Sequence, residues 1–207
     1  MKKITFLTLL MALSTSGAVM ADELEFNWNS NQGETKMVWL SFTAGKSITV
    51  DYGDGSGSFT YNGAGAGIAN LQTLDHTYAQ AGNYKVTVKT VGTDASITDF
   101  DSYLTGITSF KATALPELTY ISLSESPVTS CDLADCAKLK EVYLMGTTLT
   151  SLDLSGKKFL QTVALQTEDM ANPNRKGYLK TISFQGCDEL TNLTAFNNQL
   201  ESVNLRG

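Results

Sequence analysis

The residues of this chain that could do chemistry are few, and their spacing does not assemble a catalytic set. His76 is the only histidine, so no second imidazole is available for a metal site or a proton relay, and we expect a packed side chain. Asp51 and Asp54 precede Gly55 as in a calcium loop, but the regularly spaced ligands and the closing glutamate are absent. The sequence predicts no metal and no cofactor.

Nucleophile motifs are also missing from the chain. There is no Gly-x-Ser-x-Gly elbow, no His-Glu-x-x-His helix and no glycine-rich phosphate loop. The three cysteines, Cys131, Cys136 and Cys187, fall on apolar positions of the repeat described below, so we expect small buried side chains rather than reactive thiols. In particular, we expect no disulfide between Cys136 and Cys187. The sequence therefore predicts that the protein is not an enzyme.

Residues 1–21 have the pattern of a secretory signal peptide. Lys2 and Lys3 precede an apolar stretch, and a Val-Met-Ala site ends at Ala21. The stretch is too short to span a membrane. We therefore expect a secreted, extracellular or cell-surface protein, with the periplasm as another possible destination. Without the leader the net charge is about −8, which argues against nucleic acid as a partner.

The most specific feature of the chain is a repeat of about 21 residues between residues 107 and 207. Each half-repeat reads apolar, two residues, apolar, one residue, usually apolar. Successive half-repeats are 10 or 11 residues apart, except for one step of 19 that contains an insertion of nine residues. They start at Ile107, Leu118, Val128, Leu139, Leu149, Leu160, Leu179, Leu190 and Leu200. A fixed period of this length predicts a solenoid of short stacked strands.

The half-repeats form two alternating series. Set A starts at residues 107, 128, 149, 179 and 200, and set B at 118, 139, 160 and 190. Positions one, four and six should point inward, whereas positions three and five should point outward. Set A then exposes mainly hydroxyl side chains, which suit any solvated strand.

Set B exposes Tyr120, Glu141 and Tyr143, and exposed aromatic residues are enriched in recognition surfaces. The insertion, roughly residues 166–178, supplies the other candidates, Arg175, Lys176 and Tyr178. A tolerated surface loop explains that insertion equally well. We take these six residues as candidate partner-binding residues.

Residues 22–92 follow a different periodicity, in which apolar residues alternate with polar ones. Leu24, Phe26 and Trp28 alternate, as do Ile48 and Val50 and then Val86 and Val88. Turn signals separate these runs, which predicts a small β-sandwich. The segments Ile48–Gly55, His76-Thr-Tyr78 and Gly82–Val88 resemble a PKD-type domain. This resemblance implies an immunoglobulin-like sandwich that serves as a spacer or adhesion module on exported proteins.

The repeat itself resembles a leucine-rich repeat. The segment Leu190–Leu200 fits Leu-x-x-Leu-x-Leu-x-x-Asn-x-Leu with only Ala195 out of place, and Val128–Cys136 fits with Cys131 in a leucine position. The paired spacing is similar to the short, internalin-like repeats of bacterial surface proteins. The resemblance implies a right-handed solenoid with a surface that binds a protein or a glycan.

Together these observations predict a mainly β chain. We expect a leader at 1–21, a PKD-like sandwich at 22–92, a junction or capping coil at 93–106, and a leucine-rich-repeat solenoid at 107–207. The expected function is binding or adhesion to a macromolecular partner. The alternative is a carbohydrate-binding accessory module of a glycan-utilisation system. The last half-repeat carries no polar cap, so edge-to-edge self-association at that end is also possible.

Overall fold

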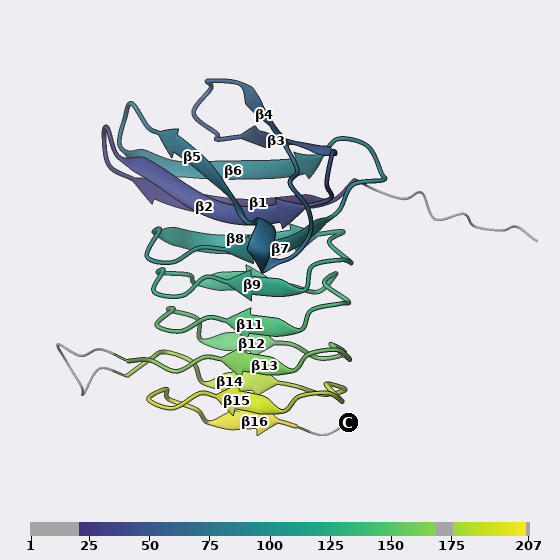
Figure 1. Ribbon diagram of the computed structural model, residues 1–207. Coiled ribbons are helices and arrows are strands. Elements are labelled where there is room, and N and C mark those ends of the chain that lie inside the picture. The colour runs from purple at the N-terminus through teal and green to yellow at the C-terminus, as the bar shows by residue number, and fades with distance from the viewer. Residues whose placement is uncertain (1–20, 169–175, 206–207) are drawn as a thin grey trace, which may run out of the picture.

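A computed structural model describes residues 21–168 and 176–205. Within these ranges the chain is almost entirely β-structure (Figure 1), and one short 3-10 helix, η1 (Ile68–Asn70), interrupts it. The first strands are β1 (Glu23–Ser30), β2 (Thr35–Phe42), β3 (Ser47–Asp51), β4 (Ser58–Asn62), β5 (Gln72–Thr77), β6 (Gly82–Thr90), β7 (Ile97–Asp101) and β8 (Ile107–Thr113). No helix in the described part of the chain is long and apolar enough to cross a membrane.

The remaining strands are three residues each and stack as a β-solenoid of about five turns, with the spacing of about 21 residues that the repeat predicts. They are β9 (Tyr120–Ser122), β10 (Ser130–Asp132), β11 (Glu141–Tyr143), β12 (Ser151–Asp153), β13 (Thr162–Ala164), β14 (Thr181–Ser183), β15 (Asn192–Thr194) and β16 (Ser202–Asn204). The central residue is buried in most of these strands, as Val142 and Leu152 are, because side chains alternate along a strand.

The N-terminal strands and the solenoid share their sheets. One sheet has six strands in the order β10-β8-β1-β6-β3-β4, and a second has seven in the order β15-β13-β11-β9-β7-β2-β5. β8 pairs with β1 on one side and with β10 on the other, while β7 lies between β2 and β9. β7 lies within the segment 93–106 and pairs in parallel with β9. The N-terminal strands and the solenoid therefore form one continuous body.

The core between the sheets runs from one end of this body to the other. In the N-terminal half it is aromatic, with Phe26 packed edge-on against Trp28 and tilted against Phe100. In the solenoid it is mostly leucine, isoleucine and valine from the inward positions of each coil. This burial of apolar side chains is what holds three-residue strands in place, because such short strands gain little from their own hydrogen bonds.

The set A strands do not form one uninterrupted stack. β12, β14 and β16 make a separate three-stranded sheet, and no ladder joins β10 to β12. Lys157 occupies this break. It is 5% exposed, and its Nζ donates to Ala134 O at 2.7 Å, across a pocket of about 350 Å³ between the two coils. In place of a strand ladder, this Lys157 bond and two bonds from Thr148, whose backbone N–H and hydroxyl both donate to Val128 O, join the two coils. The repeat pattern does not reveal this break.

Candidate functional site

Three partly exposed aromatic side chains lie on the outer face of the seven-stranded sheet. Trp39 comes from β2, Tyr120 from β9 and Tyr143 from β11, all at positions whose neighbours along the strand point into the core. We call this surface, from β2 to β11, the aromatic face. The sequence analysis identified both tyrosines but missed Trp39. The alternation of Val38, Leu40 and Phe42 as buried residues was the available signal, because it places Trp39 outward.

Strand pairing sets carboxylates between these rings. Asp101 lies opposite Trp39 on β2 and opposite Ser122 on β9. Tyr120 lies opposite Asp99 on one side and opposite Glu141 on the other. Asp101 lies 21 residues before Ser122, so the repeat extended back by one coil would have placed it here.

The two tyrosine rings are in contact, and one of them orients a carboxylate. Their centroids are 5.5 Å apart with an interplanar angle of 41°. The Tyr143 hydroxyl donates to Glu141 Oε2 at 2.8 Å. Desolvation, together with this hydrogen bond, raises the pKa of Tyr143 to about 12, and burial with the nearby Asp101 carboxylate raises the pKa of Tyr120. Both phenols are neutral hydrogen-bond donors at physiological pH.

Asp99 has a structural role instead. It is 2% exposed, and its carboxylate accepts from the hydroxyls of Ser41 (2.5 Å) and Thr98 (2.6 Å) and from the backbone N–H of Gly67 (2.9 Å). The Thr119 hydroxyl donates to its other oxygen at 3.3 Å. These bonds tie the loop that carries η1 to the sheet. A buried carboxylate with this many donors is not available to a ligand.

The turns that follow the set B strands form the edge of the aromatic face. Parallel strands place these turns on one side, and backbone bonds stack them: Leu104 N donates to Ser124 O, Glu125 N to Met145 O and Gly146 N to Gln166 O. We call this stack the turn edge. It starts with two strongly exposed apolar residues, Tyr103 (56%) and Leu104 (65%).

The turn edge repeats a left-handed backbone conformation that favours glycine. Leu104 (φ 54°), Glu125 (φ 55°), Gly146 (φ 66°) and Asn197 (φ 58°) occupy equivalent positions. A Cβ added at Gly146 would lie 2.4 Å from the end of the flexible Glu125 side chain, which would have to move, so the third turn favours glycine. Leucine is strained in this conformation and gains nothing from burial at Leu104. The fold alone does not explain a leucine there.

The insertion begins at this same edge (Figure 1). The outward face of set B and the insertion, which were separate candidates, therefore adjoin. Arg175, one of the candidate residues, lies outside the described residues. Lys176 is exposed, and Tyr178 is 49% exposed. Gly177 anchors the returning chain to the last turn, with its N–H donating to Asn197 O at 2.7 Å and its carbonyl accepting from Gln199 Nε2 at 2.8 Å.

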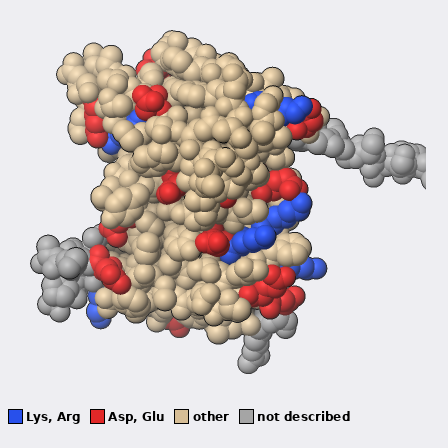
Figure 2. Space-filling view, in the orientation of Figure 1, with Lys and Arg blue, Asp and Glu red and all other residues tan. Residues whose placement is uncertain are grey.

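Charge is distributed unevenly over this side of the molecule. Figure 2 shows a largely uncharged surface with carboxylates in its middle and with Lys and Arg side chains mainly on the right, in a band that reaches toward the centre. No outward position of the described strands β2, β7, β9 and β11 is basic. The aromatic face is therefore both aromatic and acidic.

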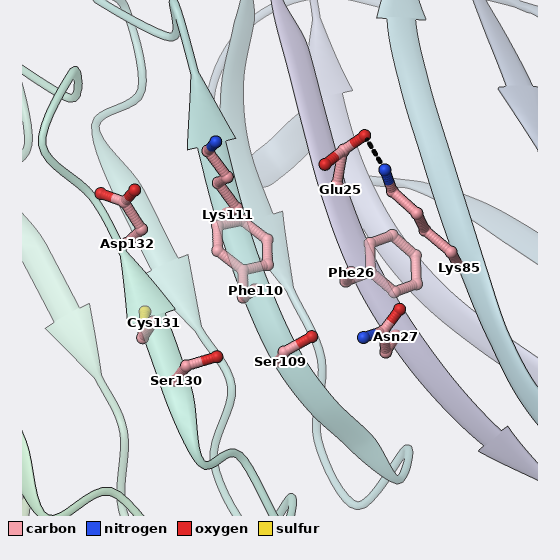
Figure 3. A pocket seen from close by; sticks show the side chains of 10 residues that line it. All are labelled: Glu25, Phe26, Asn27, Lys85, Ser109, Phe110, Lys111, Ser130, Cys131 and Asp132. Atoms are coloured by element: carbon pink, nitrogen blue, oxygen red, sulfur yellow. Dashed lines mark ion pairs between the residues drawn. The ribbon is translucent and has the colours of Figure 1, made fainter.

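The six-stranded sheet carries a hollow of about 360 Å³ on its outer face (Figure 3). Glu25 and Lys85 at its rim form an ion pair of 2.5 Å, and Lys111 lies beside Asp132 on the neighbouring strand. Burial raises the pKa of the Cys131 thiol, so this sulfur is not a nucleophile at neutral pH. The hollow has the paired charges of an ordinary solvated sheet.

Other chemistry-bearing residues are accounted for by packing. His76 stacks on Tyr52, with ring centroids 4.3 Å apart, and its Nε2 lies 2.7 Å from Asp54 Oδ2. The three cysteines are free thiols, of which Cys136 is buried and the other two are partly buried. The described residues contain no group of three or more His, Cys, Asp or Glu side chains that could hold a metal ion.

The last coil exposes residues that are buried in earlier coils. Leu193 is 39% exposed and Val203 is 41% exposed, whereas Val163 and Ile182, which they pair with, are nearly inaccessible. Among the described strands, none covers the outer edges of β15 and β16. This is the surface at which self-association was expected, and that expectation stays a prediction.

Comparison with known proteins adds no relative to this picture. No family model matches the chain, and neither a curated protein nor a solved structure shows significant similarity to it.

Proposed function

We propose that this chain is a secreted or cell-surface binding protein, and that it recognises a macromolecular partner through the aromatic face and the adjoining turn edge without turnover. In this proposal residues 107–207 are a leucine-rich repeat, and the N-terminal strands are a PKD-like module that holds the solenoid. The 21-residue coil spacing and the apolar central residue of each strand support the first identity. The strand alternation and the stacked His76 are compatible with the second.

One observation carries the functional proposal. Trp39, Tyr120 and Tyr143 share one solvent-facing surface of the sheet, although Trp39 lies 81 residues before Tyr120 and 104 before Tyr143 in the sequence. Partly exposed Trp and Tyr side chains are the residue types that contribute most to protein–protein binding energy. The strained, exposed Leu104 extends that surface along the turn edge, and strain of this kind concentrates at functional positions.

A glycan ligand is the second candidate, because aromatic rings and carboxylates also bind sugars by stacking and hydrogen bonding. The 41° angle between the Tyr120 and Tyr143 rings favours the protein ligand. Rings at such an angle do not form the flat platform on which a regular polysaccharide chain can stack.

The test is a binding screen with the protein comprising residues 22–207 against a glycan array and a panel of purified extracellular proteins. Tyr143→Ala and Trp39→Ala should each weaken a genuine interaction about tenfold or more. Phe159→Ala is the matched control, since Phe159 is 45% exposed on a turn that follows a set A strand. If neither face variant weakens binding to an identified ligand, the aromatic face is not the site. Turnover of a glycan or peptide would overturn the binding-protein proposal.

A further inference from the structure

Tyr120 lies between two carboxylates that have no positive partner in the described structure. Glu141 is directly across from it on β11, and Asp101 is on the adjacent strand β7, two residue pairs along. The register places Asp99, Asp101 and Glu141 on the two strands that flank Tyr120, and burial together with these carboxylates raises the pKa of its phenol. Since Asp99 is saturated by its own donors, Asp101 and Glu141 are the two free charges.

The opposite sheet shows what this chain does with outward carboxylates elsewhere. On β1, Glu23 and Glu25 each form an ion pair with a lysine of β6, at 3.1 Å to Lys89 and 2.5 Å to Lys85. On the aromatic face, Asp101 and Glu141 form no ion pair with any residue that the structure describes. Glu141 is instead held by the Tyr143 hydroxyl, which leaves its charge in place and fixes its position.

We propose that this arrangement binds a lysine or arginine side chain of a protein partner, with the cation over the Tyr120 ring and between Asp101 and Glu141. This inference rests on the proposed function and names the chemistry of the partner. A cation over a tyrosine face is attracted by the ring, and two flanking carboxylates strengthen that attraction. The charge complementarity selects a cationic protein segment over a neutral glycan.

The surroundings of the cradle fit an extended segment that carries apolar residues next to its basic one. Tyr103 and Leu104 follow Asp101 after a single residue, Ser102, so they expose apolar surface at one border of the cradle. Tyr143 lies at its other border, in contact with Tyr120. A side chain seated over Tyr120 would therefore bring its neighbours against apolar surface on both sides.

The experiment is selection of a displayed random-peptide library on immobilised protein of residues 22–207, followed by affinity measurement of synthetic copies of the enriched peptides. We expect enriched peptides to share a lysine or arginine. Replacing that arginine by citrulline, which keeps the shape and removes the charge, should weaken binding about tenfold. Asp101→Asn and Glu141→Gln should each weaken binding several-fold and reduce its salt dependence.

Three control variants make the test specific. Tyr120→Phe keeps the ring and should bind like wild type, whereas Tyr120→Ala should lose about tenfold. Asp153→Asn removes a carboxylate of the three-stranded sheet and should change nothing. Enriched peptides without a basic residue, no enrichment at all, or peptides insensitive to Asp101→Asn and Glu141→Gln would each overturn the cation cradle. If uncharged peptides bind and Tyr143→Ala abolishes that binding, the proposed function stands while this inference fails.

Discussion

Replacing Leu152 by aspartate tests the register on which the description of the solenoid depends. Leu152 is the central residue of β12, pairs with Ile182 on β14 and is 5% exposed. Loss of its buried side chain costs about 2–3 kcal/mol. A carboxylate placed there has no partner and costs several kcal/mol more. We expect the free energy of unfolding to fall by about 5 kcal/mol or more, one of the larger effects a single substitution can have.

The matched control is Asp153→Asn, one residue along the same strand. Asp153 is exposed, and its Oδ1 accepts from Ser155 N at 2.9 Å, a bond that an asparagine carbonyl can also accept. We expect a loss of about 0.5 kcal/mol or less. Urea unfolding followed by circular dichroism measures both free energies, and each kcal/mol should also move the melting temperature by about 2–4 °C in a chain of this size. Equal destabilisation by the two variants would refute the inward and outward assignment.

Three further outcomes are expected. Hydrogen bonds from Ser56, together with the contact to His76, lower the pKa of Asp54 to about 2. Because this value lies below the usual 3.8, the carboxylate stabilises the fold above pH 4, and that contribution is lost as the pH falls toward 2. Asp54→Asn should therefore flatten acid unfolding in that window, and an unchanged profile would exclude this linkage. Leu104→Gly should raise the free energy of unfolding by about 0.5–1 kcal/mol, since glycine relieves the left-handed backbone strain. The same substitution should weaken partner binding. A loss of stability in thermal unfolding would show that the leucine has a structural role. Mass spectrometry of the folded monomer should find no 136–187 crosslink, because Cys187 Sγ donates to Leu154 O, and detection of that crosslink would contradict the coil assignment.

The solenoid was the predictable part of this fold, because its information is local and repeated. The register of β9, β11 and β13, with Tyr120 and Tyr143 outward, follows from one apolar period read along the chain. The same period, extended one coil back, also gives β7 and therefore Asp101.

The unpredictable parts depend on pairings between residues far apart in the sequence. β1 joins β8 through partners such as Glu25 and Lys111, and no short-range pattern specifies that match. Trp39 reaches the aromatic face only because β2 pairs with β7. The break between β10 and β12, where the Lys157 side chain bonds to Ala134 O, has no counterpart in the repeat pattern. Two of the three aromatic residues were therefore predictable from the sequence. The cation cradle and the missing ladder between β10 and β12 were not.

The sharing of both sheets has a consequence for how the protein is made. In each of the two large sheets, one strand joins the solenoid to the N-terminal part. β8 pairs with β1, and β7 pairs with β2. That part is synthesised first, so it can serve as a template on which each later coil adds as it emerges. A shortened chain that begins after residue 92 would lack this template and would present two bare strand edges, the usual starting point for aggregation. In this scheme the coils would fold in the order in which they follow one another in the sequence.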